Sequence, residues 1–356
     1  MLVYFLLATP VMMDDGFHYE GFAESLAKGK LDFKSYYGFH GLSFLAVPIF
    51  WITKSEYSIV ITSTILYLLS LPLAYAIGKN FYQNKTAGLY FTALVLLMPY
   101  VYSTMMRGFQ EAALLFFVLL TLYGAVSKKK WAPVAWAYGG IVKPFNLVLL
   151  PLFVRDFLKI KKIIWLFLAL TIGAVYLGAS YYQTDHLVNN AAIGSYQGNF
   201  NTGNPPVLIE SFTPGLKGFL RVGANLLLHF RKILISPLTI VLGALVLLRN
   251  KKFLLRKEII LAILLNIILV GSLTFSFPKY LLPAVVLLAL CSVHYLLKYK
   301  WLFALVLIDS FFVFLPIWNY FGQAFWPNIY IYLLPMYLAI AVYIYARRDN
   351  HTHSNS

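Results

Sequence analysis

The chain has 356 residues, of which 60% are hydrophobic and only 12% are charged. Soluble globular domains are about 45–50% apolar and about 25% charged, so this composition excludes an ordinary soluble enzyme and indicates a membrane protein. The net charge of +16 does not indicate a nucleic-acid partner, because the basic residues lie in short breaks between apolar runs, where membrane proteins use them to fix their orientation. The single cysteine, Cys291, excludes a disulfide framework.

The apolar runs are continuous rather than alternating, which favours helices over a barrel. We expect an all-α polytopic bundle of about 12 transmembrane spans, with interfacial helices in the first external loop. The expected spans are 2–13, 57–78, 86–103, 110–126, 131–142, 144–154, 163–182, 233–248, 258–277, 280–297, 301–317 and 329–346. The segments 131–142 and 144–154, interrupted at Lys143-Pro144, predict a short helical pair or a re-entrant hairpin, and 42–52 is expected to lie flat at the membrane interface.

The basic connectors predict the orientation of the chain. With 42–52 at the interface, most of the 29 basic residues fall in short connectors on one side of the membrane, so both termini are expected in the cytoplasm. The chain then divides into a first transmembrane module, an external loop, C-terminal transmembrane helices and a cytoplasmic tail that we expect to be disordered. Their bounds are 1–182, with a further external loop 14–56 inside it, then 183–232, 233–346 and 347–356.

The segment from Met12 to Tyr19 carries two adjacent carboxylates, Asp14 and Asp15, where an apolar run reaches the outer face. A carboxylate at such a boundary can act as a general base; the alternative is a polar pair that only marks the end of the helix. His18 lies one helical turn beyond Asp14. Asp15 and His18 are therefore candidate ligands of a divalent cation, although no further ligand spacing supports a metal site.

Three basic residues, Arg107, Lys143 and Lys279, are expected on the same outer side. A cation inside a helical break is costly unless it meets an anion, so three cations opposite two carboxylates favour a phosphate-bearing ligand at the membrane surface. The alternative for each cation is that it only extends to the interface. Glu111, one turn beyond Arg107, is the expected ion-pair partner of that arginine.

Several of these residues belong to short motifs that follow one another in a fixed order. The series is the acidic pair, Tyr19, Ala23 to Gly29 (Ala-x-x-Leu-Ala-x-Gly), His40-Gly41, Ala76 to Tyr82, Arg107 to Glu111, the Gly-x-x-x-Lys-Pro break of Gly139 to Pro144, and Lys279 to Pro283 (Lys-Tyr-Leu-Leu-Pro). The ordered set resembles that of the GT-C membrane glycosyltransferases, in particular the protein mannosyltransferase and aminoarabinose transferase group. The resemblance covers residues 1–160 and, beyond them, only the Lys-Tyr-Leu-Leu-Pro motif.

The resemblance implies an inverting hexosyl or pentosyl transferase in the cell membrane, with 1–182 as its catalytic part. It would move a sugar from a polyprenyl- or dolichyl-phosphate donor to a glycan, lipid or protein acceptor on the extracytoplasmic side, among membrane lipids. Asp14 would be the base, and Asp15 would orient it or hold a divalent cation, the one cofactor left open. The implied substrate-binding residues are Arg107, Lys143, Lys279, Glu111, His40 and Tyr19.

Two positions depart from the family pattern, because Asp15 stands where Glu is usual and Lys279 where Arg is usual. A rival interpretation is a transporter or flippase for a lipid-linked sugar or another anionic substrate, with Asp309 and His294 inside their spans as a coupled site. No internal repeat supports it, and a structural hydrogen-bonding role for both residues is favoured. A third alternative is an inactive membrane scaffold.

The expected orientation predicts the protease accessibility of epitope tags in intact cells. Tags in the connectors 79–86 and 249–257 should be protected, because both connectors carry cytoplasmic basic residues, whereas a tag beside Asn201 should be cleaved. The reverse pattern would overturn the topology and the placement of Asp14 and Lys143 on one face.

Overall fold

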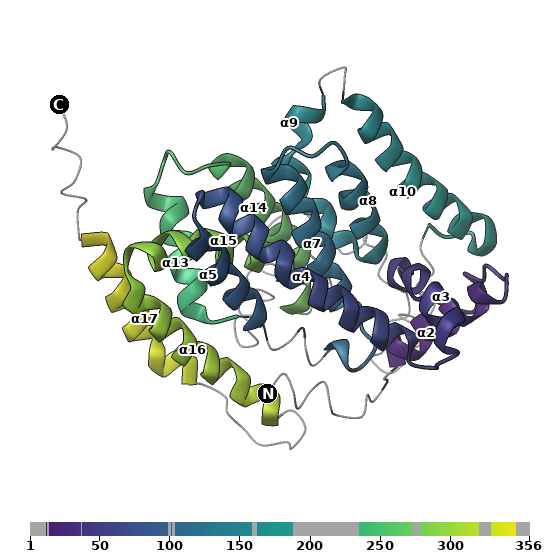
Figure 1. Ribbon diagram of the computed structural model, residues 1–356, viewed down its shortest axis with the longest axis horizontal. Coiled ribbons are helices and arrows are strands. Elements are labelled where there is room, and N and C mark those ends of the chain that lie inside the picture. Colours follow the sequence, from purple (N-terminus) through teal and green to yellow (C-terminus); the bar gives the residue numbers. More distant parts are fainter. Residues whose placement is uncertain are drawn as a thin grey trace.

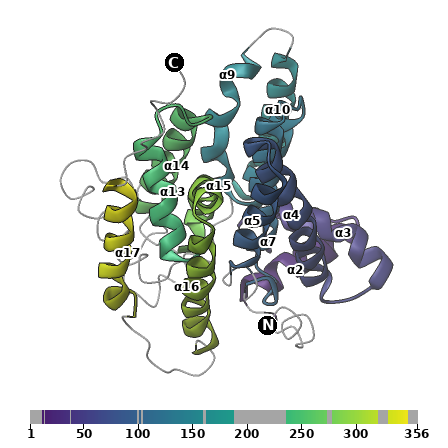
Figure 2. The same ribbon diagram turned by 60° about the vertical axis from the view of Figure 1, so that its left-hand side comes forward.

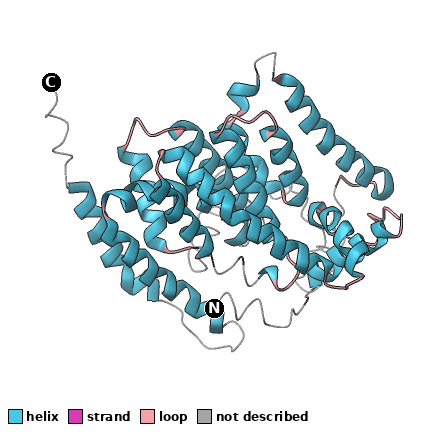
Figure 3. Cartoon of the chain, in the orientation of Figure 1, coloured by secondary structure: helices cyan, strands magenta, loops and turns pink. Residues whose placement is uncertain are grey.

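In the computed structural model, residues 12, 14–36, 38–98, 101, 104–158, 162–187, 235–272, 278–319 and 329–346 are described. Every regular element within these ranges is a helix, as the ribbon coloured by secondary structure shows (Figure 3). The predicted all-α class is therefore confirmed for this part of the chain. The expected span 2–13, most of the loop 183–232 and the tail 347–356 lie outside the described residues.

The helices follow the expected segments closely. The first external segment contains α2 (Asp14–Ala27) and α3 (Gly41–Thr53). The middle of the chain contains α4 (Ser58–Tyr82), α5 (Lys85–Leu96), α7 (Glu111–Val126), α8 (Ala132–Val142), the 3-10 helix η1 (Pro144–Leu152), α9 (Val154–Phe157) and α10 (Ile163–Thr184). The C-terminal part contains α13 (Pro237–Arg249), α14 (Arg256–Ser272), the 3-10 helix η2 (Pro278–Leu281), α15 (Leu282–Lys298), α16 (Lys300–Asn319) and α17 (Ile329–Ala346).

Three of the described helical segments are long and apolar enough to cross a bilayer, namely Ser58–Tyr82, Ile163–Thr184 and Lys279–Lys298. Several shorter apolar helices accompany them, and α10 exposes large apolar side chains such as Ile164, Phe167 and Val175. Such exposed apolar surface is what lipid covers in an integral membrane protein. The number of spans and the side on which each terminus lies stay predictions.

The helices form a bundle with the external segment at one end. Figures 1 and 2 show α4, α5 and α7 in the middle, α16 and α17 on one flank, and α2 and α3 at the opposite end. One large apolar core joins α4, α5 and α7 to α13, α14 and α15. Two smaller clusters fasten the external segment, one between α2, α3 and α7 and one between α2, α3 and α10.

Polar bonds also tie the external segment to the bundle. The buried carboxylate of Glu20 on α2 accepts hydrogen bonds from Ser58 Oγ at 2.6 Å and from the Ile59 backbone N–H at 2.8 Å, so that it caps the first turn of α4. Burial raises the pKa of Glu20, and these hydrogen bonds oppose that shift. On the other side, the Tyr176 hydroxyl accepts from the His40 backbone N–H at 3.0 Å. The segment is therefore held at fixed points on α4 and α10.

The break at Lys143-Pro144 gives the predicted short helical pair. A residue before proline is disfavoured in the helical region, and Lys143 is accordingly extended, with φ −152° and ψ 135°. Its N–H still closes the last turn of α8 by donating to Gly139 O at 2.8 Å. The chain then turns into η1, which packs against α8, so both lie beside one another as a hairpin.

Helices α4 and α5 approach closely because each presents a glycine to the other. A Cβ on Gly78 would lie 2.6 Å from Ala87 O, and a Cβ on Gly88 would lie 2.7 Å from Tyr75 O. Small residues of this kind allow membrane helices to pack backbone against backbone. The turn between them ends at Asn84, whose side chain accepts from Thr86 N at 2.8 Å and caps α5.

We expect Gly88→Val to destabilise the protein by about 1–3 kcal/mol, because the added atoms force α4 and α5 apart. Thermal unfolding in detergent, followed by size-exclusion chromatography, measures the loss. The matched control is Gly173→Val on α10, where a Cβ meets nothing within 4 Å. Equal melting temperatures for the two variants would contradict the close packing of α4 on α5.

Candidate active site

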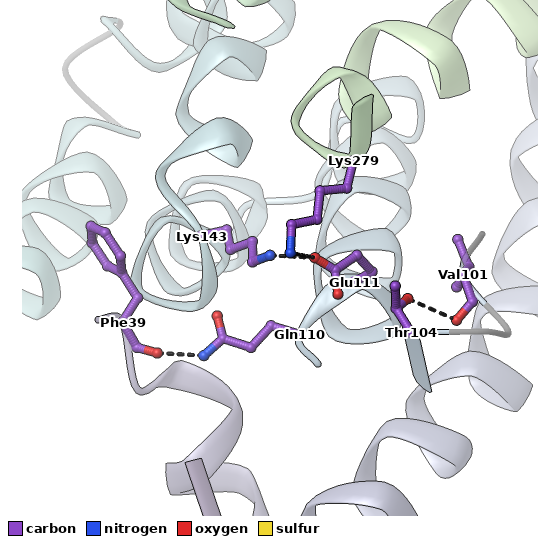
Figure 4. Close-up of polar contacts among 7 residues, drawn as sticks. All are labelled: Phe39, Val101, Thr104, Gln110, Glu111, Lys143 and Lys279. Carbon is purple, nitrogen blue, oxygen red and sulfur yellow. Dashed lines mark hydrogen bonds and ion pairs between the residues drawn. The ribbon is translucent and has the colours of Figure 1, made fainter. Parts of the chain in front are cut away.

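Two lysines from distant parts of the chain meet one carboxylate. Lys143 forms an ion pair with Glu111, and the Lys279 ammonium lies 3.5 Å from the same Glu111 oxygen. Glu111 is 1% exposed, and each lysine side chain is 11% exposed. Figure 4 shows the two side chains arriving from different elements and pointing at Glu111. Because buried charges need partners, these three residues, here called the lysine–glutamate cluster, must form together.

Each member of the cluster stands at the end of a helix. Glu111 is the first residue of α7, where a carboxylate also meets the helix dipole favourably. Lys143 occupies the extended break between α8 and η1, and Lys279 lies in η2, just before α15. Side chains from different helices can converge on one point where those helices end. Pro144 and Pro278 stand beside the two lysines at such ends, so the Lys-Pro and Pro-Lys-Tyr sequences account for the position of both cations.

Aromatic rings line the two lysines. The Lys279 ammonium lies 4.8 Å from the centre of the Phe109 ring, and Lys143 lies 5.6 Å from that of Tyr280. Tyr280 in turn stacks on Phe145, with ring centres 4.3 Å apart. The negative face of each ring attracts the ammonium group that lies over it.

The first turn of α2 lies against the turn that leads to Glu111. A Cβ on Gly16 would collide with the Arg107 carbonyl, and one on Gly108, whose φ is +77°, would lie 3.0 Å from Gly16 Cα. Only glycine permits that approach. Asp15, half-buried one residue earlier, acts electrostatically on Lys143 and on Tyr280. The structure thus places Asp15 within electrostatic range of Lys143 and packs the residue after it against Arg107.

The acidic pair opens a helix, since α2 begins at Asp14. The expected apolar span 2–13 before it lies outside the described residues, so the prediction that the pair follows the end of that span stays a prediction. Acidic residues are favoured in a first turn because they satisfy its unpaired N–H groups and its dipole. Glu111, expected beside Arg107, pairs instead with the two lysines, partners that sequence spacing does not suggest.

Three other predicted site residues belong to packing around α2. His40 is fully buried and stacks on Phe22 with ring centres 3.9 Å apart. Burial lowers the pKa of His40 to about 3, so it is neutral at physiological pH and contributes no charge. Tyr19 is buried and lies edge-on to His40, while His18 is half-buried and edge-on to Tyr36.

The predicted metal site at Asp15 and His18 has no third ligand among the described residues. There, no group of three or more His, Cys, Asp and Glu side chains gathers as a metal site requires. Asp15 and His18 stay predicted ligands, and no chemical step is derived from a bound cation.

Asp309 has the structural role that was favoured for it. One oxygen accepts from Ser236 Oγ and from Leu238 N at 3.1 Å, and the other accepts from the Tyr337 hydroxyl. The carboxylate of α16 thereby caps α13 and fastens α17. His294 packs edge-on against Tyr295, with ring centres 5.4 Å apart. These bonds use both oxygens of Asp309 to hold helices together, which favours a structural role over a coupled transport site.

Gln110, which no sequence motif singles out, connects the cluster to the external segment. The amide of Gln110 donates to the Phe39 carbonyl, immediately before His40, and its own oxygen has no hydrogen-bond partner in the described part of the chain. The second oxygen of Glu111 is likewise buried without one. Buried acceptors of this kind can receive donors from a ligand. A polar residue at the start of an apolar span is the only sequence signal of Gln110.

The fold is similar to that of a solved membrane protein. A crystal structure of ArnT from Cupriavidus metallidurans in the apo state matches 83% of this chain with a TM-score of 0.50 and 12% sequence identity. The chain spans 58% of the length of that protein. No protein-family model matches the sequence, and no curated protein matches it either. At this identity the similarity shows a shared fold over most of the chain.

The lysine–glutamate cluster predicts unequal effects of its single substitutions. Glu111→Gln leaves two buried cations without a counter-charge and should cost about 3–5 kcal/mol of unfolding free energy, whereas Lys143→Met leaves Lys279 paired and should cost less. Thermal unfolding in detergent gives the order. Lys28→Met, which breaks an exposed pair with Glu24, is the control and should change little. Equal losses in all three variants would show that the cluster is not a charge-balanced unit.

Proposed function

We propose that the protein is an integral membrane glycosyltransferase that transfers a sugar from a polyprenyl- or dolichyl-phosphate donor to an acceptor outside the cytoplasm, with inversion at the sugar. The observation that carries the proposal is the meeting of Lys143 and Lys279 at Glu111. The ordered sequence motifs and the fold shared with ArnT, a GT-C aminoarabinose transferase, support it.

The charge of the cluster suits a phosphate ligand. Two lysines and one glutamate leave a formal excess of one positive charge, buried beneath aromatic rings. An ammonium carries three N–H donors, so the bond to Glu111 does not exhaust either lysine. A phosphodiester brings one negative charge and two free oxygens, which would balance the excess and receive these donors. In this proposal Lys143 and Lys279 bind the donor phosphate.

The reaction needs two contributions from the chain. The acceptor hydroxyl attacks the anomeric carbon on the face opposite the phosphate, and the bond from that carbon to the phosphate oxygen breaks, with its electron pair leaving on the lipid phosphate. The lysines stabilise the negative charge that develops on this leaving group. Asp14 takes the hydroxyl proton as general base, and Asp15 orients it, as in other inverting sugar transfers.

The position of α2 supports this division of roles. Its first turn begins at Asp14, and Gly16 packs against Gly108, three residues before Glu111. Asp15 acts electrostatically on Lys143. An acidic pair placed at the edge of a cationic cluster can hold the acceptor on one side while the lysines hold the phosphate on the other.

We expect Asp14→Asn to reduce turnover by about 10²–10⁴-fold while donor binding stays nearly unchanged, since the substitution removes the proton acceptor but keeps its size. The assay incubates the purified protein in lipid with labelled polyprenyl-phosphate sugars and measures transfer to added acceptors.

The control for this assay is Asp309→Asn, which weakens the bonds to Ser236 and Tyr337 without approaching the proposed site. It should transfer sugar at close to the wild-type rate. If Asp309→Asn stops activity while Asp14→Asn keeps it, the glycosyltransferase assignment fails and a transporter takes its place.

A further inference from the structure

A buried asparagine fastens the segment that carries Lys279. Asn266, in the middle of α14, is fully buried, and its amide donates to the Tyr280 carbonyl at 3.0 Å. The side-chain oxygen of Asn266 accepts from Ala284 N at 3.1 Å. Pro283 has no N–H of its own, and this bond satisfies the next N–H in the opening turn of α15. Both bonds of one amide therefore hold the junction of η2 and α15.

A second buried asparagine fastens the segment that carries Lys143. Asn146 is fully buried in η1, and its amide donates to the Trp136 carbonyl of α8 at 2.9 Å. The Trp136 indole donates back to Leu147 O at 3.0 Å, so the two helices are linked in both directions. Gly139 makes room for this, since a Cβ there would collide with the Asn146 amide. The Asn146 N–H also donates to Lys143 O at 3.1 Å.

We propose that Asn266 and Asn146 are positioning residues, each of which sets the backbone that carries one of the two lysines of the lysine–glutamate cluster. The proposal rests on the proposed function in so far as these lysines bind the donor phosphate. It adds that the cluster is preorganised by two amides that touch neither the lysine ammonium groups nor Glu111.

Burying the Asn266 amide in the middle of an apolar helix costs free energy, and a positioning role would explain why the residue is there. A polar group in the membrane interior is unfavourable unless it is fully bonded, and an apolar residue would pack α14 equally well. A side chain that binds the backbone at Tyr280, the residue after Lys279, and at Ala284 in the next turn restricts where that lysine can reach. Preorganised cations bind an anion without the entropic loss of ordering flexible side chains.

Site-specific acylation of lysines tests the proposal without any assumption about activity. The purified full-length protein in nanodiscs is treated briefly with an amine-reactive acylating reagent, and the modification of each lysine is followed by peptide mass spectrometry. Lys143 and Lys279 are nearly buried and ion-paired, so both should react slowly in the wild type. Asn266→Leu should speed the reaction of Lys279 about tenfold and leave Lys143 little changed, and Asn146→Leu should do the reverse.

Equilibrium binding of polyprenyl phosphate, the carrier that remains whichever sugar is transferred, provides the second readout. Both asparagine variants should weaken this binding about tenfold. The matched control is Tyr82→Phe, which removes a 2.7 Å hydrogen bond to Leu290 O in the middle of α15, away from Lys279. This variant should lower the melting temperature as much as the asparagine variants do. It should change neither lysine reactivity nor binding, because the lost hydrogen bond only stabilises the helix.

Unchanged lysine reactivity in both asparagine variants would overturn the proposal, and so would a general increase that Tyr82→Phe also produces. Asn266→Ser and Asn146→Ser, which keep a small hydrogen-bonding group, replace the leucine variants if these do not fold. Reciprocal labelling supports the positioning role even if the wild type binds no polyprenyl phosphate. That last result would count against the proposed function and not against the placement of the lysines.

Discussion

The rest of the site depends on one buried carboxylate. Glu111 cannot be removed from water without a counter-charge, and Lys143 and Lys279 cannot be buried without an anion. The three charges come from α7, from the α8–η1 break and from η2, so none of these segments reaches its place independently. Packing alone would tolerate a small sliding of helices in a bundle this apolar, whereas ion pairs between helix ends fix the register. The cluster therefore fixes the positions of these helix ends at the proposed phosphate site.

Sequence reasoning identified the elements well because helix formation here is local. The break at Lys143 follows from Pro144, and the ends of α4, α8 and α15 lie within a few residues of the expected spans. The segment 42–52 was expected as a separate short helix and is α3. Lys143 and Lys279 are functional candidates from sequence because a cation in a helical break is costly unless an anion lies nearby. The structure supplies that anion, Glu111, for both lysines.

What sequence reasoning missed concerns partners that are remote in the chain. Glu111 was assigned to the nearby Arg107, since spacing on a helix gives only local neighbours. His40 was expected to bind substrate, and its burial against Phe22 depends on how α3 folds back onto α2. Asn266 was not recognised, although an amide in an otherwise apolar span was visible, because the carbonyl it binds follows a break that only the fold defines.

Hydrogen bonds join the external segment to the bundle in addition to the two apolar clusters. Glu20 caps α4, Gln110 holds the Phe39 carbonyl, and the Tyr138 hydroxyl donates to Gly41 O at 3.0 Å. Such bonds are directional and individually worth about 0.5–1.5 kcal/mol, so they fix an orientation more than they add stability. The external segment that carries Asp15 is therefore held in a fixed orientation relative to the bundle that carries the lysines. The proposed reaction requires this, because its base and its phosphate-binding cations come from these two parts of the chain.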